Sequence, residues 1–123
     1  MANRPRGEME VKLGKDILIL KPDFERLVEI EEAAGGNAGG GIPAMLRRFA
    51  SREFRLKDVA AVYFGGSGGA LEFNEIGNRI MKDGLRDHAN NAAAFISDAI
   101  TPEQKEDASA LGKEPTPTPP PST

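Results

Sequence analysis

Hydrophobic and polar residues alternate near the start of the chain, in the pattern of a strand with one solvated face. Met9, Val11 and Leu13 alternate with charged residues, and Gly14-Lys15 then supplies a short turn. The apolar run Ile17 to Leu20 predicts a second strand, buried on both faces or nearly so. Because an isolated hairpin is marginally stable in water, helices must cover the apolar face of this one.

The chain that follows carries apolar residues at helical spacing. Phe24, Leu27, Val28, Ile30 and Ala34 form the first such stripe, behind Asp23 as a predicted N-cap. Similar stripes recur up to Ile100. The predicted elements are a hairpin over residues 8–21 and helices over about 23–34, 43–51, 57–64, 74–83 and 86–100.

Glycine and asparagine mark the predicted helix ends. Gly35-Gly36 is typical of a C-terminal cap, and the segment Gly35 to Gly41 is predicted to be a flexible loop. The cluster Gly65 to Gly69 is predicted to terminate the third helix. Asn74 is a candidate N-cap for the fourth helix, and Gly84 is predicted to close it.

The fold class predicted from these elements is α+β, mostly α: an N-terminal β-hairpin packed on four or five short helices. We expect one globular domain over residues 8–100, after a flexible N-terminus over residues 1–7. Residues 101–123 predict a marginal short helix and then a disordered tail rich in Pro and Thr.

Composition narrows the range of functions. The chain has 123 residues and a formal net charge of −3, so no strong positive field draws it to nucleic acid or to an anionic membrane. With no Cys and a single His, thiolate and histidine-rich metal sites are excluded. No apolar segment suggests a signal peptide or a membrane helix, so the expected location is the cytoplasm.

The residues that could carry chemistry favour structural interpretations. The glycine clusters lack the Lys and Ser/Thr of a phosphate-binding loop and are more typical of connectors. His88 has no nucleophile marked beside it and is interpreted as a surface or helix-boundary residue. Glu29, Glu31 and Glu32 diverge on a helix, so a solvated face is favoured over a cation site. We therefore predict no catalytic residues, no metal site, no cofactor and no enzymatic activity.

One basic cluster invites a binding function. It comprises Arg47, Arg48, Arg52, Arg55 and Lys57, with two phenylalanines among them. A nucleic-acid patch is conceivable on these residues. Because the chain as a whole is acidic, a solvated face or a contact with an acidic protein partner is favoured.

Four stretches, taken in order, resemble a known family. Asn3 to Glu8 leads directly into the hairpin, and Phe24 to Gly35 is similar to the family's Leu-x-x-Leu-Glu-x-x-x-Gly helix. Leu56 to Tyr63, with the glycines that follow, resembles the family's Asp-Val-Ala motif, and Gly84-Leu85 precedes an alanine-rich helix. The family comprises small tail proteins of gene transfer agents and tailed phages, classed as tail assembly chaperones and also labelled tail tube proteins.

This resemblance implies a non-enzymatic assembly factor. Its implied partners are the tape measure protein, which it would bind transiently, and the tail tube protein, whose subunits it would help to recruit. The alternative is a structural tail tube or tail-completion subunit that stays in the particle. A third hypothesis is a small nucleic-acid-binding regulator that uses the basic cluster.

Two apolar helix faces are the candidates for a partner-binding groove. A helical stripe of a partner could lie in such a groove, although in so small a chain assignment of both faces to the core is favoured. The candidate residues are Met45, Leu46, Phe49, Val59, Val62 and Tyr63.

Overall fold

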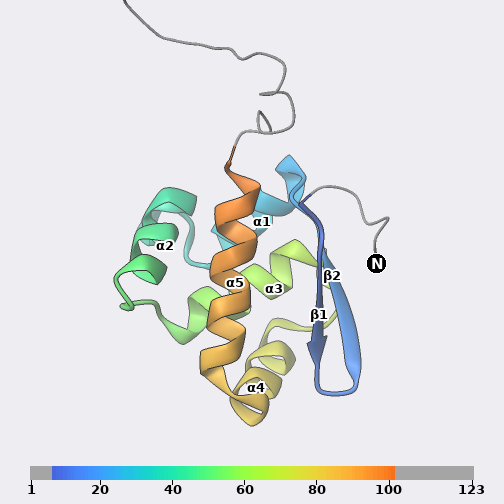
Figure 1. Cartoon of the computed structure of the whole chain (residues 1–123). Coiled ribbons are helices and arrows are strands. Elements are labelled where there is room, and N and C mark those ends of the chain that lie inside the picture. The colour runs from blue at the N-terminus through green and yellow to red at the C-terminus, as the bar shows by residue number, and fades with distance from the viewer. Residues whose placement is uncertain (1–6, 102–123) are drawn as a thin grey trace, which may run out of the picture.

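The computed structural model describes residues 7–101, and Figure 1 shows how its elements are arranged. Five α-helices and one two-stranded hairpin lie within these residues, so the predicted class, α+β and mostly α, is confirmed. The marginal helix and the tail predicted after Thr101 lie outside the described residues, as do residues 1–6. The elements are β1 (Met9–Leu13), β2 (Asp16–Leu20), α1 (Phe24–Ala33), the 3-10 helix η1 (Gly36–Gly39), α2 (Gly41–Ala50), α3 (Leu56–Gly66), α4 (Phe73–Asp83) and α5 (Leu85–Ala99).

The two strands form an antiparallel hairpin. Its last pair is Leu13 opposite Asp16, so Gly14 and Lys15 make a two-residue turn, with Gly14 at a φ of +65°. One face of the hairpin is buried, with Val11 and Leu18 among its residues. The expectation that β2 is buried on both faces was wrong, because its side chains alternate and Ile17 is 56% exposed.

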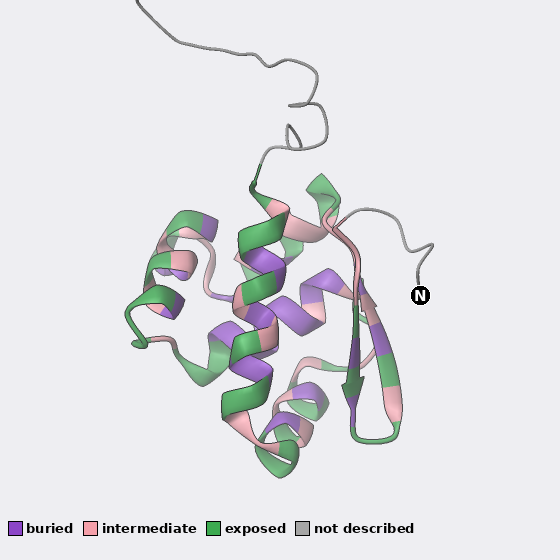
Figure 2. Ribbon diagram, viewed as in Figure 1, coloured by how far each residue is buried: buried purple, intermediate pink, exposed green. Residues whose placement is uncertain are grey.

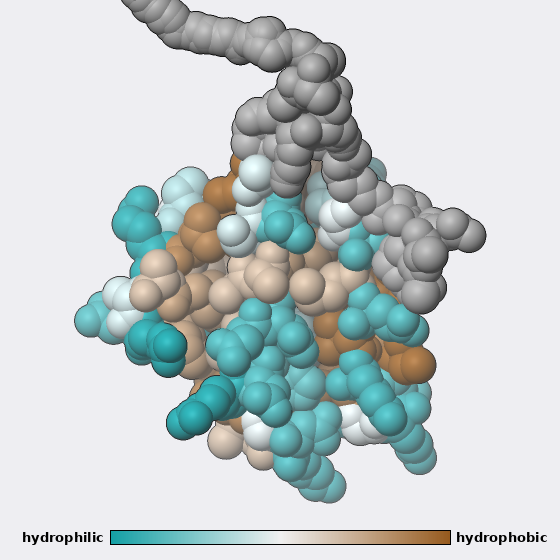
Figure 3. All heavy atoms as spheres, viewed as in Figure 1, coloured by the Kyte–Doolittle hydropathy of each residue, from teal (hydrophilic) through white to brown (hydrophobic). Residues whose placement is uncertain are grey.

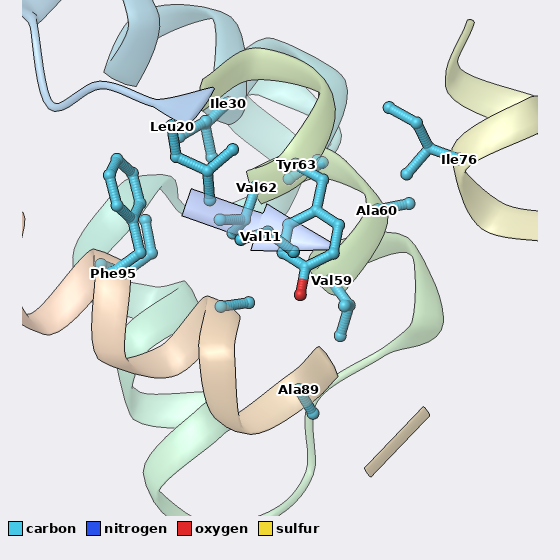
Figure 4. Close-up of a cluster of buried hydrophobic side chains, with 14 of the residues drawn as sticks. Val11, Leu20, Ile30, Val59, Ala60, Val62, Tyr63, Ile76, Ala89 and Phe95 are labelled. Carbon is cyan, nitrogen blue, oxygen red and sulfur yellow. The ribbon is translucent and has the colours of Figure 1, made fainter. Parts of the chain in front are cut away.

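Helix α3 lies at the centre of the fold. It packs against α1, α4, α5 and β2, and its buried segment is the most continuous in Figure 2. Figure 4 shows part of the cluster around it, which includes Val62 and Tyr63 of α3, Leu20 of the hairpin and Phe95 of α5. The hairpin and the surrounding helices therefore share one apolar core, as the instability of an isolated hairpin requires.

Two glycines of α3 allow its neighbours to approach closely. The cluster Gly65 to Gly69 was expected to terminate the helix, and α3 does end within it, at Gly66; Gly65 and Gly66 themselves are buried. A Cβ atom on Gly65 would lie 2.4 Å from the backbone nitrogen of Ile30 in α1. At Gly66 the backbone oxygen accepts a hydrogen bond of 3.0 Å from the backbone N–H of Lys21, just after β2.

Several predicted helix ends differ from the observed ones. The segment expected to be a flexible loop contains η1, closed by Gly40 at a φ of +79°. Helix α4 begins at Phe73, so Asn74 lies inside it and is not the N-cap. On α1, Phe24 is 82% exposed, although its spacing placed it on the apolar stripe. Its position in the first turn, away from the elements that cover Ile30, explains the difference.

Candidate partner-binding surface

Five of the six residues predicted to bind a partner belong to the core. Val59, Val62 and Tyr63 have no exposed surface, and Met45 and Phe49 are 1% and 7% exposed. Only Leu46 is half-buried, packed against the same core. Met45, Val59, Val62 and Tyr63 are therefore core residues, which is the alternative that the sequence analysis favoured, because α5 and the other helices around α3 already cover them. Phe49 also lines a surface hollow beside α5.

A carboxylate is buried at the start of α3. Asp58 has no exposed surface and accepts hydrogen bonds from two arginines: from Arg48 Nε at 2.8 Å and Nη2 at 2.7 Å, and from Arg55 Nη2 at 2.6 Å. Burial alone would raise the pKa of Asp58, but these hydrogen bonds outweigh it and lower the pKa to about 2. The same arginines donate to the backbone oxygens of Gly39 and Ala34, so one ion cluster fixes α1, η1 and α2 to α3.

This cluster divides the basic segment. Arg48 and Arg55 are used to neutralise Asp58, which leaves Arg47, Arg52 and Lys57 exposed. The three exposed cations lie on α2, on the loop that follows it and on α3, not along one helix face. Such a divided set provides a weak basis for contacts with a nucleic-acid backbone, which favour several cations along one surface.

A second network of polar groups runs from the core to the surface. Tyr63 Oη lies 2.7 Å from His88 Nδ1, and His88 Nε2 lies 3.3 Å from a carboxylate oxygen of Asp83. That oxygen accepts a hydrogen bond of 2.9 Å from the backbone N–H of Gly14 in the hairpin turn. Figure 4 shows Tyr63 with its hydroxyl oxygen directed toward α5, which carries His88.

The network of Tyr63, His88, Asp83 and Gly14 has a structural role. His88 is 5% exposed, so it is not a surface residue, but it does lie near a helix boundary, in the first turn of α5. Burial raises the pKa of Tyr63 above its usual value, and the hydrogen bonds from Gly14 and His88 lower the pKa of Asp83. A Tyr–His–Asp series can in principle move a proton, but Tyr63 has no exposed surface at which a substrate could bind. The four groups instead join α3, α5, α4 and the hairpin turn.

The acidic residues of α1 do not converge. Glu31 accepts a hydrogen bond of 2.8 Å from the backbone N–H of Ile42 at the start of α2, while Glu29 and Glu32 are exposed. Within residues 7–101 there is no group of three or more His, Asp or Glu side chains that could hold a metal ion. Nor does any helix in that range combine the length and hydrophobicity needed to cross a bilayer.

An open groove lies between the start of α3 and the outer face of α4. Its volume is about 610 Å³, and two of its apolar side chains, Leu56 and Met81, are 41% and 56% exposed. Gly77 of α4 also lines the groove, and a Cβ atom at this position would meet nothing within 4 Å. The lining residues are Leu56, Lys57, Ala60, Phe73, Asn74, Gly77, Asn78 and Met81.

The α3–α4 groove was missed by the sequence prediction. On α4, the repeat of Phe73, Gly77 and Met81 at four-residue spacing places them on one face, which was a usable signal. Opposite them, Leu56 at the first position of α3 contributes the other wall. Comparison of the chain with protein-family models, with curated proteins and with solved structures finds no match to any of them.

Proposed function

We propose that this chain is a non-enzymatic tail assembly factor of a phage or gene transfer agent. It binds the tape measure protein transiently and helps to recruit tail tube subunits, in the cytoplasm of the bacterial host during tail assembly. The proposal rests on the resemblance of residues 3–100 to the tail assembly chaperone family. The observation that supports it in the fold is the α3–α4 groove, an open hollow in which apolar side chains of two helices are exposed to a partner.

The groove suits a reversible contact. Because Leu56 and Met81 are each about half exposed, covering them contributes on the order of 1 kcal/mol apiece. Gly77 lets a partner backbone approach α4 closely, since no side chain stands in the way. A contact of this size is weak by itself and gains strength by repetition along a long partner, which allows tube subunits to displace it.

The proposal is tested by filling the groove without disturbing the fold. Gly77→Leu places a large side chain where a Cβ atom has no neighbour, and it removes a glycine that costs a helix interior about 1 kcal/mol. We therefore expect a variant that is at least as stable as the wild type, judged by urea unfolding. Its affinity for purified fragments of the proposed tape measure protein partner should fall at least tenfold in calorimetry.

Gly77→Ala is the matched control, because it gives the same gain in helix propensity with only one methyl group in the groove. It should bind nearly as well as the wild type. If the wild type does not bind any tape measure fragment, the proposed function is wrong. If Gly77→Leu binds as tightly as Gly77→Ala, the function could stand but the groove is not its site. Stoichiometric retention of the chain in purified particles, measured by mass spectrometry, would favour the structural-subunit alternative instead.

A further inference from the structure

A second hollow lies between α5 and the segment formed by the end of α2 and the loop that follows it. It has a volume of about 280 Å³, and none of its residues lines the α3–α4 groove. Figure 3 shows this face, where moderately hydrophobic residues gather between α2 and α5 with hydrophilic residues around them. The lining residues are Phe49, Arg52, Phe54, Leu85, Arg86, Ala89, Asn90 and Ala93.

The hollow combines an apolar floor with a cationic rim. The rings of Phe49 and Phe54 pack together with their centroids 5.5 Å apart, and Ala89 adds a small buried residue beside them. At the rim, Arg52 and Arg86 are both exposed, and neither guanidinium makes a hydrogen bond or an ion pair with another residue in the range 7–101. By contrast, Arg48 and Arg79 both form ion pairs with acidic side chains.

The backbone holds Arg52 in an unusual conformation. Its φ is +66°, and it is the one residue other than glycine with a positive φ in the described chain. It occupies the position after the C-cap of α2, where its N–H donates to the Phe49 oxygen at 3.2 Å and the Glu53 N–H donates to the Arg48 oxygen at 2.8 Å. This Schellman arrangement usually has glycine at that position. An arginine there places a cation beside the hollow at a cost in backbone energy.

We propose that this hollow is a docking site for an acidic amphipathic segment of a partner protein. A large apolar side chain of the segment enters between Phe49 and Ala89, and flanking carboxylates pair with Arg52 and Arg86. Charge complementarity identifies the occupant, because the guanidinium groups of Arg52 and Arg86 have no acidic partner among residues 7–101. A chain with a net charge of −3 repels acidic proteins over most of its surface, so the positive rim also selects where they bind.

Nucleic acid fits this hollow less well than an acidic protein segment. A phosphate backbone needs a row of cations and no apolar cavity, whereas here two cations flank a floor of two phenyl rings. The same two arginines can also pair bidentately with carboxylates, which fixes the orientation of a bound peptide.

The experiment compares two synthetic peptides on the isotope-labelled full-length chain. Both are capped amphipathic helices of about 14 residues with Leu and Phe on one face. One peptide carries Glu at the flanking positions, and its twin carries Gln. We expect amide shift changes centred on Ala89, Asn90 and Ala93, and an affinity for the Glu peptide several times that for the Gln twin.

Substitutions at the rim separate charge from shape. Arg86→Gln should lower the affinity for the Glu peptide by about two- to fivefold, the range for one solvated ion pair. The affinity for the Gln twin should not change. Arg47→Gln removes an exposed arginine that does not line the hollow and should change neither peptide. Gly77→Leu should also leave both affinities unchanged, so this test and that of the proposed function fail independently.

Four results would overturn the inference. Equal affinity for the two peptides would show that the cations do not select the partner. Shift changes confined to the α3–α4 groove, or no binding at millimolar peptide, would remove the site. A DNA duplex that shifts the same amides more strongly than the Glu peptide does would assign the hollow to nucleic acid.

Discussion

Asp58→Asn is expected to cost the domain about 2–3 kcal/mol at neutral pH. The carboxylate is fully buried and receives charge-assisted hydrogen bonds from Arg48 and Arg55, and its pKa lies near 2 instead of the ordinary 3.8. At about 1.4 kcal/mol per pKa unit, that shift corresponds to about 2 kcal/mol. Asparagine also turns an amide N–H₂ toward a guanidinium, which adds an unsatisfied donor. The loss is a large part of the 5–15 kcal/mol typical of a domain.

The same shift fixes the sign of the pH dependence. Because the folded-state pKa is lowered, the stabilisation from Asp58 is fully present above pH 3.8 and is lost as the pH falls from 3.8 toward 2. Urea unfolding of the wild type and of Asp58→Asn should therefore differ most at pH 7, and the difference should shrink across that window. Asp98→Asn, the same change at an exposed position on α5, should cost less than about 0.5 kcal/mol. A difference that is independent of pH, or as small as that of the control, would refute the reasoning.

Three further changes test other parts of the fold. Gly65→Ala should lower the free energy of unfolding, measured in urea, by about 1–3 kcal/mol or more, because its Cβ would lie 2.4 Å from the backbone of Ile30. An unchanged free energy would contradict the close approach of α1 and α3. Tyr63→Phe should cost about 1–2 kcal/mol, seen as a lower melting temperature, since it leaves the buried His88 Nδ1 without its partner; an unchanged melting temperature would show that the hydrogen bond is dispensable. Arg52→Gly should stabilise the domain by about 0.5–1 kcal/mol, because glycine adopts a positive φ without the steric cost that arginine has there. It should also lower the affinity for the acidic peptide. A loss of stability would count against backbone strain at this position.

The local elements could be predicted from the sequence because local patterns specify them. The alternation around Val11 and the turn at Gly14 identified the hairpin, and the predicted helices overlap the five observed ones to within about two residues at each end. Gly84 was correctly predicted to close α4, since it takes a φ of +123° there. These features depend on residues close together in the chain.

The candidate sites could not be predicted in the same way, because they depend on packing between distant segments. Nothing near Asp58 in the sequence shows that Arg48 will neutralise it, and a buried charge is an unusual expectation for an aspartate. Met45 and Tyr63 were candidates for a binding face because helical spacing alone does not tell a core stripe from an exposed one. The buried contact of His88 could not be predicted because its partner Tyr63 lies 25 residues earlier on another helix.

The contact between Gly65 and Ile30 restricts how this chain can diverge. The atom that excludes a side chain at position 65 belongs to the backbone of position 30, so no substitution of Ile30 can make room for one. Asp58, about two helical turns earlier on α3, is similarly constrained by the two arginines that enclose it. Distant relatives should therefore retain this Asp and this Gly at fixed separation on one helix after their other residues have changed, which gives a physical signature for finding them.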